Sequence, residues 1–227
     1  MQVEKISIVI PVLNEAIAIR TVLAQVLDTP NVEAIVVDGG SEDDTVAIAQ
    51  TMGVKVISTT AGRARQMNAG VAVATGDILL FLHADTQLPS NFDSFVRQAL
   101  QKPGTVAGAF ELRINAQLRG IKLIERMVNW RSHFLSMPYG DQAIFLKTSV
   151  FTELGGFPNL PIMEDFELMR RLKRLGQIAI VSAPVLTSGR RWQKLGVVKT
   201  TLINQLIIAG YFLGVPPAEL VRWYRRK

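Results

Sequence analysis

The sequence predicts an α/β fold with a mostly parallel, doubly wound sheet and an amphipathic helical extension at its C-terminal end. Apolar runs at 6–13, 32–37, 54–58 and 76–85 have the composition of strands. At 16–27 and 90–101 apolar residues recur at helical spacing, and further helices are expected from Ser41 and over 62–74. Such regular alternation of strand and helix favours parallel strands joined by right-handed crossovers.

Two turn signals refine this first half. Pro11 cannot donate a hydrogen bond to a neighbouring strand, so the first strand is expected to end there. Ser41 is a good N-cap for the second helix, and Asp44 stands where a capping-box carboxylate would. Glu42 and Asp43 are then first-turn acids that the helix dipole favours.

The second half predicts strands at 106–114, 140–147 and 178–181 and helices at 118–130, 150–154 and 163–176. The stretch 197–215 is strongly apolar but contains Lys199, Asn204 and Gln205. Its helical part, 200–215, has 16 residues, fewer than the roughly 20 that cross a bilayer. We therefore expect a buried helix or one that lies at an interface, followed by a basic tail at 223–227.

Composition narrows the functional classes. The 227 residues are 48% hydrophobic and contain no cysteine, which excludes disulfides and thiolate chemistry. The formal net charge is +6, with basic residues concentrated at 170–174, 190–194 and 222–227, so anionic partners are expected. Nucleic acid is the weakest candidate, because no binding motif accompanies the charges. A strand begins almost at the first residue, which predicts a cytoplasmic protein.

Polar residues follow three of the predicted strands. Glu15, Asp38 and Asp85 stand at strand tips, and Asp165 opens a later helix. Ligands of open α/β sheets bind at the carboxyl ends of the strands, so these carboxylates are expected to converge. His83 and Asp85 alternate and point the same way in an extended segment. Taken alone, Asp85 is better explained as a residue that braces its turn.

Converging carboxylates repel one another unless a cation or a hydrogen-bonding ligand compensates. The expected counter-charges are Arg63 or Arg65 near the start of a helix, and Arg190 or Arg191 late in the chain. A divalent metal ion on a diphosphate would meet the same need.

The order of motifs resembles that of the inverting family 2 glycosyltransferases, which have the A-type, Rossmann-like nucleotide-diphospho-sugar fold. The matching segments are IPVLNEA, VVDGGSEDDT, GRARQMNAG, GDILLFLHADT, ELGGF and MEDFELMRRLKRLG, and they cover most of 6–176. The resemblance implies a catalytic domain at 1–190, with a nucleotide-binding half at 1–102 and an acceptor-binding half at 103–190. Residues 191–227 would form the basic helical extension.

The same resemblance assigns roles to individual residues. Asp85 would bind Mn²⁺ or Mg²⁺ as the last Asp of a DxD motif, and Asp165, paired with Glu164, would be the general base. The nucleotide, most often a uridine diphosphate, would contact Pro11, Asn14, Glu15, Asp38, Arg63, Gln66, His83, Ala84 and Arg191.

Two departures from the family pattern affect these roles. His83 replaces the first Asp of DxD, although an imidazole can still donate a hydrogen bond or bind Mn²⁺. Ser188 stands where the Gln of the processive QxxRW motif would be, which predicts a single transfer.

The segments HADT, YGDQAIF and SGRRW are most similar to those of one bacterial subfamily. Its members are labelled as arsenosugar-biosynthesis or radical-SAM/selenodomain-associated glycosyltransferases.

The leading hypothesis is an inverting, metal-dependent, non-processive transfer of a sugar from a nucleotide-diphospho-sugar to a small or lipid-like acceptor. One alternative is a non-catalytic module that binds sugar nucleotides. Another is a peripheral enzyme on the inner face of the membrane that acts on a carotenoid or other lipid, or a protein whose basic tail mainly binds lipid. The sequence leaves a homodimer open.

Overall fold

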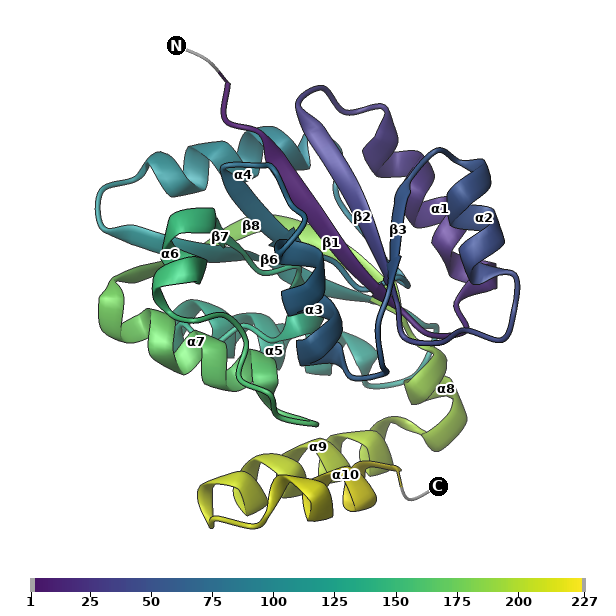
Figure 1. Ribbon diagram of the computed structural model, residues 1–227. Helices are drawn as coiled ribbons and strands as arrows, with labels where there is room; N and C mark the ends of the chain where they lie inside the picture. Colours follow the sequence, from purple (N-terminus) through teal and green to yellow (C-terminus); the bar gives the residue numbers. More distant parts are fainter. Residues whose placement is uncertain (1–2, 226–227) are drawn as a thin grey trace.

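The computed structural model describes residues 3–225, and within them one sheet of eight strands organises the molecule (Figure 1). The strand order is β3-β2-β1-β4-β7-β6-β8-β5. The strands span Ile6–Val12 (β1), Val32–Asp38 (β2), Lys55–Ser58 (β3), Ile78–Phe81 (β4), Thr86–Gln87 (β5), Thr105–Asn115 (β6), Phe145–Lys147 (β7) and Gln177–Ser188 (β8). The predicted mostly parallel α/β sheet is confirmed, because only β5 and β7 run antiparallel to their neighbours.

Helices cover both faces of this sheet (Figure 1). Ile8 and Ile10 of β1 pack against one set of helices, α1, α2, α4 and α5, whereas Val9 faces α3, α6 and α7. A strand buried on both faces therefore reads as one continuous apolar run. The helices span Ala16–Leu27 (α1), Thr45–Thr51 (α2), Arg63–Val71 (α3), Phe92–Gln101 (α4), Ile121–Leu135 (α5), Thr148–Glu153 (α6) and Glu164–Leu175 (α7).

Three short helices follow β8, where the sequence predicted one helix and a basic tail. They are α8 (Arg190–Leu195), α9 (Val197–Phe212) and α10 (Pro217–Arg225). α9 and α10 form a hairpin beside the sheet (Figure 1), and its Ile207 and Leu220 are buried with Phe166 of α7. Within 3–225 no helix has the length and apolarity to cross a membrane. The last two residues of the predicted tail, Arg226 and Lys227, lie outside the described range.

Several predicted boundaries were wrong for physical reasons. β1 continues through Pro11 to Val12, whose carbonyl accepts the N–H of Gly39. α2 begins at Thr45 instead of Ser41, because the Asp38 carboxylate accepts the N–H of Ser41 and holds that residue in a turn. The predicted helix at 118–130 is displaced to Ile121–Leu135.

Two further errors concern strands near the site. The predicted strand at 140–147 is divided into a 3-10 helix, η1 (Gly140–Gln142), and the short β7, with Ala143 between them at φ 50°. The strand predicted at 178–181 does not stop at the Ser-Ala-Pro sequence that follows. After a shift in register at Val181, β8 pairs again from Pro184 to Ser188, so it reaches the edge where α8 starts.

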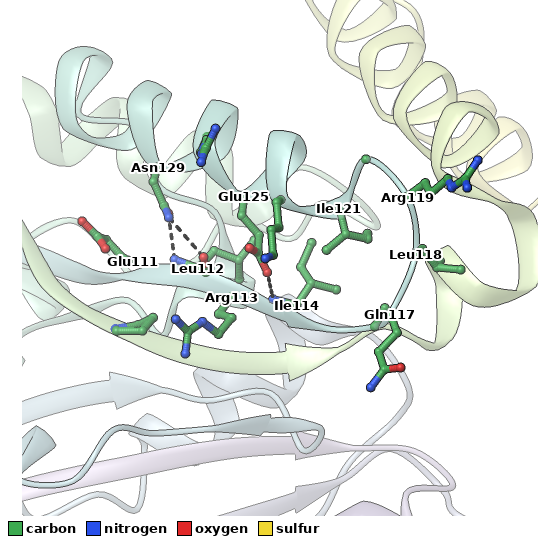
Figure 2. A pocket seen from close by; sticks show the side chains of 15 residues that line it. Glu111, Leu112, Arg113, Ile114, Gln117, Leu118, Arg119, Ile121, Glu125 and Asn129 are labelled. Carbon is green, nitrogen blue, oxygen red and sulfur yellow. Dashed lines mark hydrogen bonds between the residues drawn. The ribbon is translucent and has the colours of Figure 1, made fainter.

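Side chains of α5 complete the pairing of β6 where β7 has ended (Figure 2). The Asn129 amide accepts the N–H of Leu112 at 2.8 Å and donates to its carbonyl at 3.1 Å. One turn earlier, the Glu125 carboxylate accepts the N–H of Ile114 at 2.7 Å. These bonds fix α5 against the half of the sheet that carries β6 and β8.

Near the amino-terminal end of β2, the Glu33 carboxylate accepts hydrogen bonds from several neighbouring groups. It accepts hydrogen bonds from Ser7, from the backbone and side chain of Thr75, and from Lys5 at 2.9 Å. Partial burial alone would raise its pKa, but these donors outweigh burial and lower the pKa of Glu33 to about 2.

We predict that Glu33→Gln lowers the free energy of unfolding by roughly 2–3 kcal/mol at pH 7. A carboxyl with a depressed folded-state pKa contributes its stability above the unfolded pKa of about 4.3 and loses it as pH falls toward 2. The difference from wild type, measured by urea unfolding, should therefore shrink between pH 5 and pH 2.5. Glu153→Gln, at an exposed carboxylate, is the control, and an equal effect of both variants would contradict the prediction.

Candidate functional site

One arginine bridges two of the predicted strand-tip carboxylates. The Arg190 Nη2 atom, at the start of α8, lies 2.8 and 3.0 Å from the two Glu15 oxygens and 3.0 Å from Asp85 Oδ2. Burial raises the pKa of Glu15, and the adjacent Arg190 acts in the opposite direction. The structure thus brings Glu15, Asp85 and Arg190 together around one position for a cation.

The loops after β1 and β2 hold each other in place beside this cluster. Asp38 is 5% exposed, and its carboxylate accepts the N–H groups of Gly40 at 2.9 Å and Ser41 at 3.0 Å. Asn14, at φ 56°, donates its N–H to Ser41 Oγ and accepts the N–H of Glu42. The two loops therefore present a fixed polar surface at the edge of β1 and β2.

Gln66 ties α3 to the same edge. Its Nε2 donates to the carbonyls of Val12 and Val37, both at 2.9 Å, so this side chain closes the ends of β1 and β2. Gly70, one turn further along α3, allows the close approach, because a Cβ there would lie 2.4 Å from a Val9 methyl group. Pro11 and Gln66 both line the cavity described below.

A second group of charges lies at the start of α7. Glu164 is 2% exposed and pairs with Arg63 Nη1 at 3.4 Å. Burial raises the pKa of Glu164, its neighbour Asp165 raises it further, and Arg63 opposes both. Asp165 Oδ2 accepts the N–H of Gly140 at 2.7 Å, and its Oδ1 accepts the N–H of Phe166 at 2.7 Å. The Asp165 carboxylate is thus held in one orientation by two backbone donors.

His83 and Ala84 lie between β4 and Asp85. Burial and the nearby Arg63 guanidinium lower the pKa of His83 to about 3, so the imidazole is neutral at physiological pH. A neutral imidazole can donate one hydrogen bond and offer its other nitrogen to a metal ion. Ala84 is buried in the core.

The two other candidate arginines point elsewhere. Arg65 donates to Thr60 Oγ1. The Arg191 guanidinium stacks on the Tyr224 ring, with its Cζ 3.7 Å from the ring centroid, and donates to the Tyr224 carbonyl at 3.0 Å. Consecutive helical residues differ by about 100° in direction, so Arg190 and Arg191 cannot face the same cluster. Arg191 links α8 to α10 instead.

The carboxylates of both clusters, together with Arg63, line one cavity of about 700 Å³. One further wall comes from the C-terminal hairpin, through Asn204, Ile207 and Ile208 of α9 and Val221 and Tyr224 of α10. Sheet edge and hairpin therefore enclose a space that is charged on one side and largely apolar on the other, within the size range of small-molecule sites.

Sequence reasoning missed Asp141, which lines the same cavity from η1. Its Oδ1 is buried and has no hydrogen-bond partner among the described residues. Burial raises the pKa of Asp141 to about 6, against the opposing charge of Arg131 and with a further rise from Asp165. The only signal is the GDQ sequence itself, which the composition of 140–147 assigns to a strand.

Its neighbour Gln142 explains why Asp141 is held there. The Gln142 amide donates to the carbonyl of Phe110 at 2.8 Å and accepts from Ser132 Oγ at 2.9 Å, deep in the core. The turn is thereby anchored, and the Asp141 carboxyl has an acceptor atom left over for a ligand. Buried polar atoms without partners cost stability, so they are informative when they line a cavity.

The carboxylates of the cavity fit a metal ion only in part. Within the described part of the chain, no group of three or more His, Asp or Glu side chains could by itself enclose a metal ion. Glu15 and Asp85 nevertheless share one cation, the Arg190 guanidinium. Mg²⁺-type sites commonly use one or two carboxylates and complete the coordination with substrate phosphates and water. The residues therefore fit a metal ion that arrives with a phosphate-bearing ligand.

We predict that Asp141→Asn raises the free energy of unfolding at pH 8 by roughly 1–3 kcal/mol. A carboxyl with a raised folded-state pKa destabilises the fold once it ionises, so wild type loses this stability as pH rises from about 4 to about 6. The amide cannot ionise, and the two proteins should be alike at pH 4 and below in urea unfolding. Asp28→Asn, at an exposed position, is the control. Destabilisation by Asp141→Asn at both pH values would show that the carboxylate supports the fold.

Comparison with solved structures shows the same fold in sugar-nucleotide enzymes. A mannosyltransferase from Pyrobaculum calidifontis, in complex with GDP-Man and Mn²⁺, superposes with a TM-score of 0.66 at 18% identity, over 82% of this chain and 57% of that one. Glucosyl-3-phosphoglycerate synthase from Mycobacterium tuberculosis, in complex with Mn²⁺, UDP-glucose and phosphoglyceric acid, gives 0.59 at 23% identity, over 80% and 70%.

Relatives found by sequence are likewise named as sugar transferases or glycosyltransferases. An undecaprenyl-phosphate 4-deoxy-4-formamido-L-arabinose transferase of Sodalis glossinidius (strain morsitans) is 33% identical over 144 residues, 57% of this chain and 43% of the relative. A probable glycosyltransferase of Bacillus subtilis (strain 168), YdaM, is 26% identical over 207 residues, 77% of this chain and 48% of the relative. The chain thus spans about half the length of these relatives. The model of the family "Glycosyl transferase family 2" matches residues 7–157, so the chain belongs to glycosyl transferase family 2.

Proposed function

We propose that this chain is an inverting, metal-dependent glycosyltransferase that moves one sugar from a nucleoside-diphospho-sugar, with UDP as the nucleotide. The observation that carries the proposal is the pair of charge clusters on one cavity: Glu15 and Asp85 around a cation position, and Asp165 held beside Glu164 and Arg63. A donor diphosphate needs the positive charge of the first cluster, and an acceptor hydroxyl needs the carboxylate base of the second.

At the donor end, the loops after β1 and β2, which carry Asn14 and Asp38 just outside the cavity lining, would bind the nucleoside. Asp85, with Glu15, would hold Mn²⁺ or Mg²⁺, which supplies positive charge that stabilises the departing diphosphate. Arg190, which pairs with both carboxylates here, lies beside that position, and its guanidinium offers charge-assisted hydrogen bonds to the same diphosphate. Two solved structures of similar fold contain Mn²⁺ with GDP-Man or UDP-glucose, which supports this type of donor.

At the acceptor end, Asp165 is the general base. The Gly140 N–H holds one carboxylate oxygen in place, and this fixes the orientation of the group that takes the proton from an acceptor hydroxyl. The hydroxyl oxygen then attacks the anomeric carbon as the bond to the diphosphate breaks, on the opposite face of the sugar. Inversion follows. Glu164 is a positioning residue, because it pairs with Arg63 in the buried wall of the cavity.

The acceptor side of the proposal rests on the cavity wall. Ile207, Ile208 and Val221 give an apolar surface beside the base, which suits a small or lipid-like acceptor. Ser188 pairs through its N–H with the Asp85 carbonyl and accepts the N–H of Arg190, so it belongs to the turn that positions Arg190. Because Ser188 replaces the Gln of the processive motif, a single transfer per binding event stays the prediction.

A second candidate is a peripheral membrane enzyme with a carotenoid or other lipid acceptor. Exposed apolar residues on α9 favour it: Leu202, Leu206 and Phe212 are 64%, 53% and 69% exposed. Three points stay predictions from the sequence. They are membership of the bacterial arsenosugar-associated subfamily, a cytoplasmic location and the formation of a homodimer.

Calorimetric titration with UDP should give binding that Mn²⁺ or Mg²⁺ strengthens, and Asp85→Ala should weaken the metal-dependent binding roughly tenfold or more, the equivalent of one charge-assisted contact. Asp28→Ala, an exposed carboxylate at the far end of α1, should bind as wild type does. No binding of UDP, GDP or other nucleotides would exclude the donor site.

Removal of the base distinguishes an enzyme from a non-catalytic binding module. Asp165→Asn keeps an oxygen that can accept the Gly140 N–H but removes the base, so turnover should fall roughly 10²–10⁴-fold. The measurement is nucleotide release from UDP-glucose and GDP-mannose, with UDP affinity expected to stay at the wild-type value. Glu153→Gln is the control. Unchanged turnover in Asp165→Asn would remove the base assignment, and a wild type that binds UDP without releasing it from either donor would favour the module.

A further inference from the structure

The solvent face of α5 carries an apolar stripe. Leu123, Met127, Trp130 and Phe134 are 59%, 53%, 57% and 72% exposed, and their spacing of four, three and four residues places them on one side of the helix. The opposite side, including the buried Ile121, packs on the sheet. A helix that is apolar on its outer face needs a partner for that face, because contiguous exposed apolar patches usually mark interaction sites.

Two aromatic side chains form the centre of this stripe. The rings of Trp130 and Phe134 are stacked, with their centroids 5.3 Å apart. Stacking gives the pair a flat, preorganised surface while most of both rings stays in contact with water. Aromatic rings of this kind are typical of surfaces that enter the boundary between lipid headgroups and acyl chains.

A hollow of about 710 Å³ lies beside the stripe, between β6, the turn at 116–120 and the first half of α5 (Figure 2). Figure 2 shows that Asn129 and Glu125 form its inner wall, where both side chains are bonded to the backbone of β6. Its acids are thus engaged: Glu125 accepts the Ile114 N–H, and Glu111 pairs with His133 at 2.9 Å.

Basic residues line the same hollow: Arg113, Arg119, Lys122 and Arg126. None of the four forms an ion pair within the range 3–225. Lys122 and Arg126 are four residues apart, so they lie one above the other on α5, on the flank between the hollow and the apolar stripe. Positive charge is therefore available at the edge of the apolar surface.

We propose that this surface is a docking site for a lipid bilayer that contains anionic lipids. We call it the α5 face, and it consists of Leu123, Met127, Trp130 and Phe134 together with Arg113, Arg119, Lys122 and Arg126. The apolar stripe enters the interface, and the cations around the hollow bind the phosphate of a lipid headgroup. Charge complementarity selects this partner, because each Lys or Arg near an anionic surface strengthens binding roughly fivefold.

The α5 face is separate from the cavity at the edge of the sheet, and no residue is shared between the two linings. Docking there does not depend on sugar transfer. It would place α5, and not the C-terminal hairpin, against the membrane.

The test is flotation of the full chain with vesicles of phosphatidylcholine alone or with 30% phosphatidylglycerol. We expect wild type to float with the anionic vesicles and to bind neutral ones at least tenfold more weakly. Trp130→Ser/Phe134→Ser and Lys122→Glu/Arg126→Glu should each reduce binding to anionic vesicles at least tenfold. All four side chains are exposed, so both variants should keep the wild-type melting temperature.

Two double variants serve as matched controls for this test. Leu202→Ser/Leu206→Ser removes equally exposed apolar side chains from α9, and Lys102→Glu/Arg174→Glu makes the same change in net charge at exposed positions elsewhere. Both controls should float as wild type does. Loss of flotation in the α9 control with full flotation in the α5 variants would overturn the proposal.

A second measurement distinguishes a bilayer from another copy of this chain. Light scattering after gel filtration, without vesicles, should give the same mass for wild type and for Trp130→Ser/Phe134→Ser. A wild-type dimer that this variant converts to a monomer, with vesicle binding unaffected, would make the α5 face a protein interface and overturn bilayer docking. Wild type that floats with neither type of vesicle would also overturn it.

Discussion

Electrostatic repulsion among five carboxyl groups is the constraint on which the site depends. Glu15, Asp85, Glu164, Asp165 and Asp141 all line one cavity of about 700 Å³. Arginines offset this repulsion, and they come from distant parts of the chain: α8 supplies the bridge between Glu15 and Asp85, and α3 supplies the partner of Glu164. The site therefore forms only when the last third of the chain has folded onto the first.

The first half of the site could be predicted from the sequence because a simple rule governs it. Parallel strands end at the same edge, so the residues that follow β1, β2 and β4 must come close together. The rule predicts the proximity of Glu15 and Asp85, which the structure joins through Arg190. Alternation of strands and helices was also enough to predict the mostly parallel sheet, since it reflects burial on two faces and does not depend on details of packing.

The remainder depends on contacts that no local pattern records. Asp141 was missed because GDQAIFLK has the composition of a strand, whereas Gln142 bonds to Phe110 and Ser132 and turns the chain into η1. The choice between Arg190 and Arg191 needed the direction in which β8 delivers α8, and β8 itself continues past a Ser-Ala-Pro sequence that predicts an end. The hairpin of α9 and α10 is held by Phe166, far away in the sequence.

The bonds from α5 to β6 have a consequence for how this molecule can associate. Beyond Gly108, β6 has no strand on its β7 side, and the N–H groups of Leu112 and Ile114 would form an open edge. Such edges recruit strands from other molecules and lead to aggregation. Asn129 and Glu125 occupy those donors with side chains, as a neighbouring strand would with its backbone. Growth of the sheet by addition of a foreign strand is blocked there, which leaves side-chain surfaces as the means by which this part of the protein meets a partner.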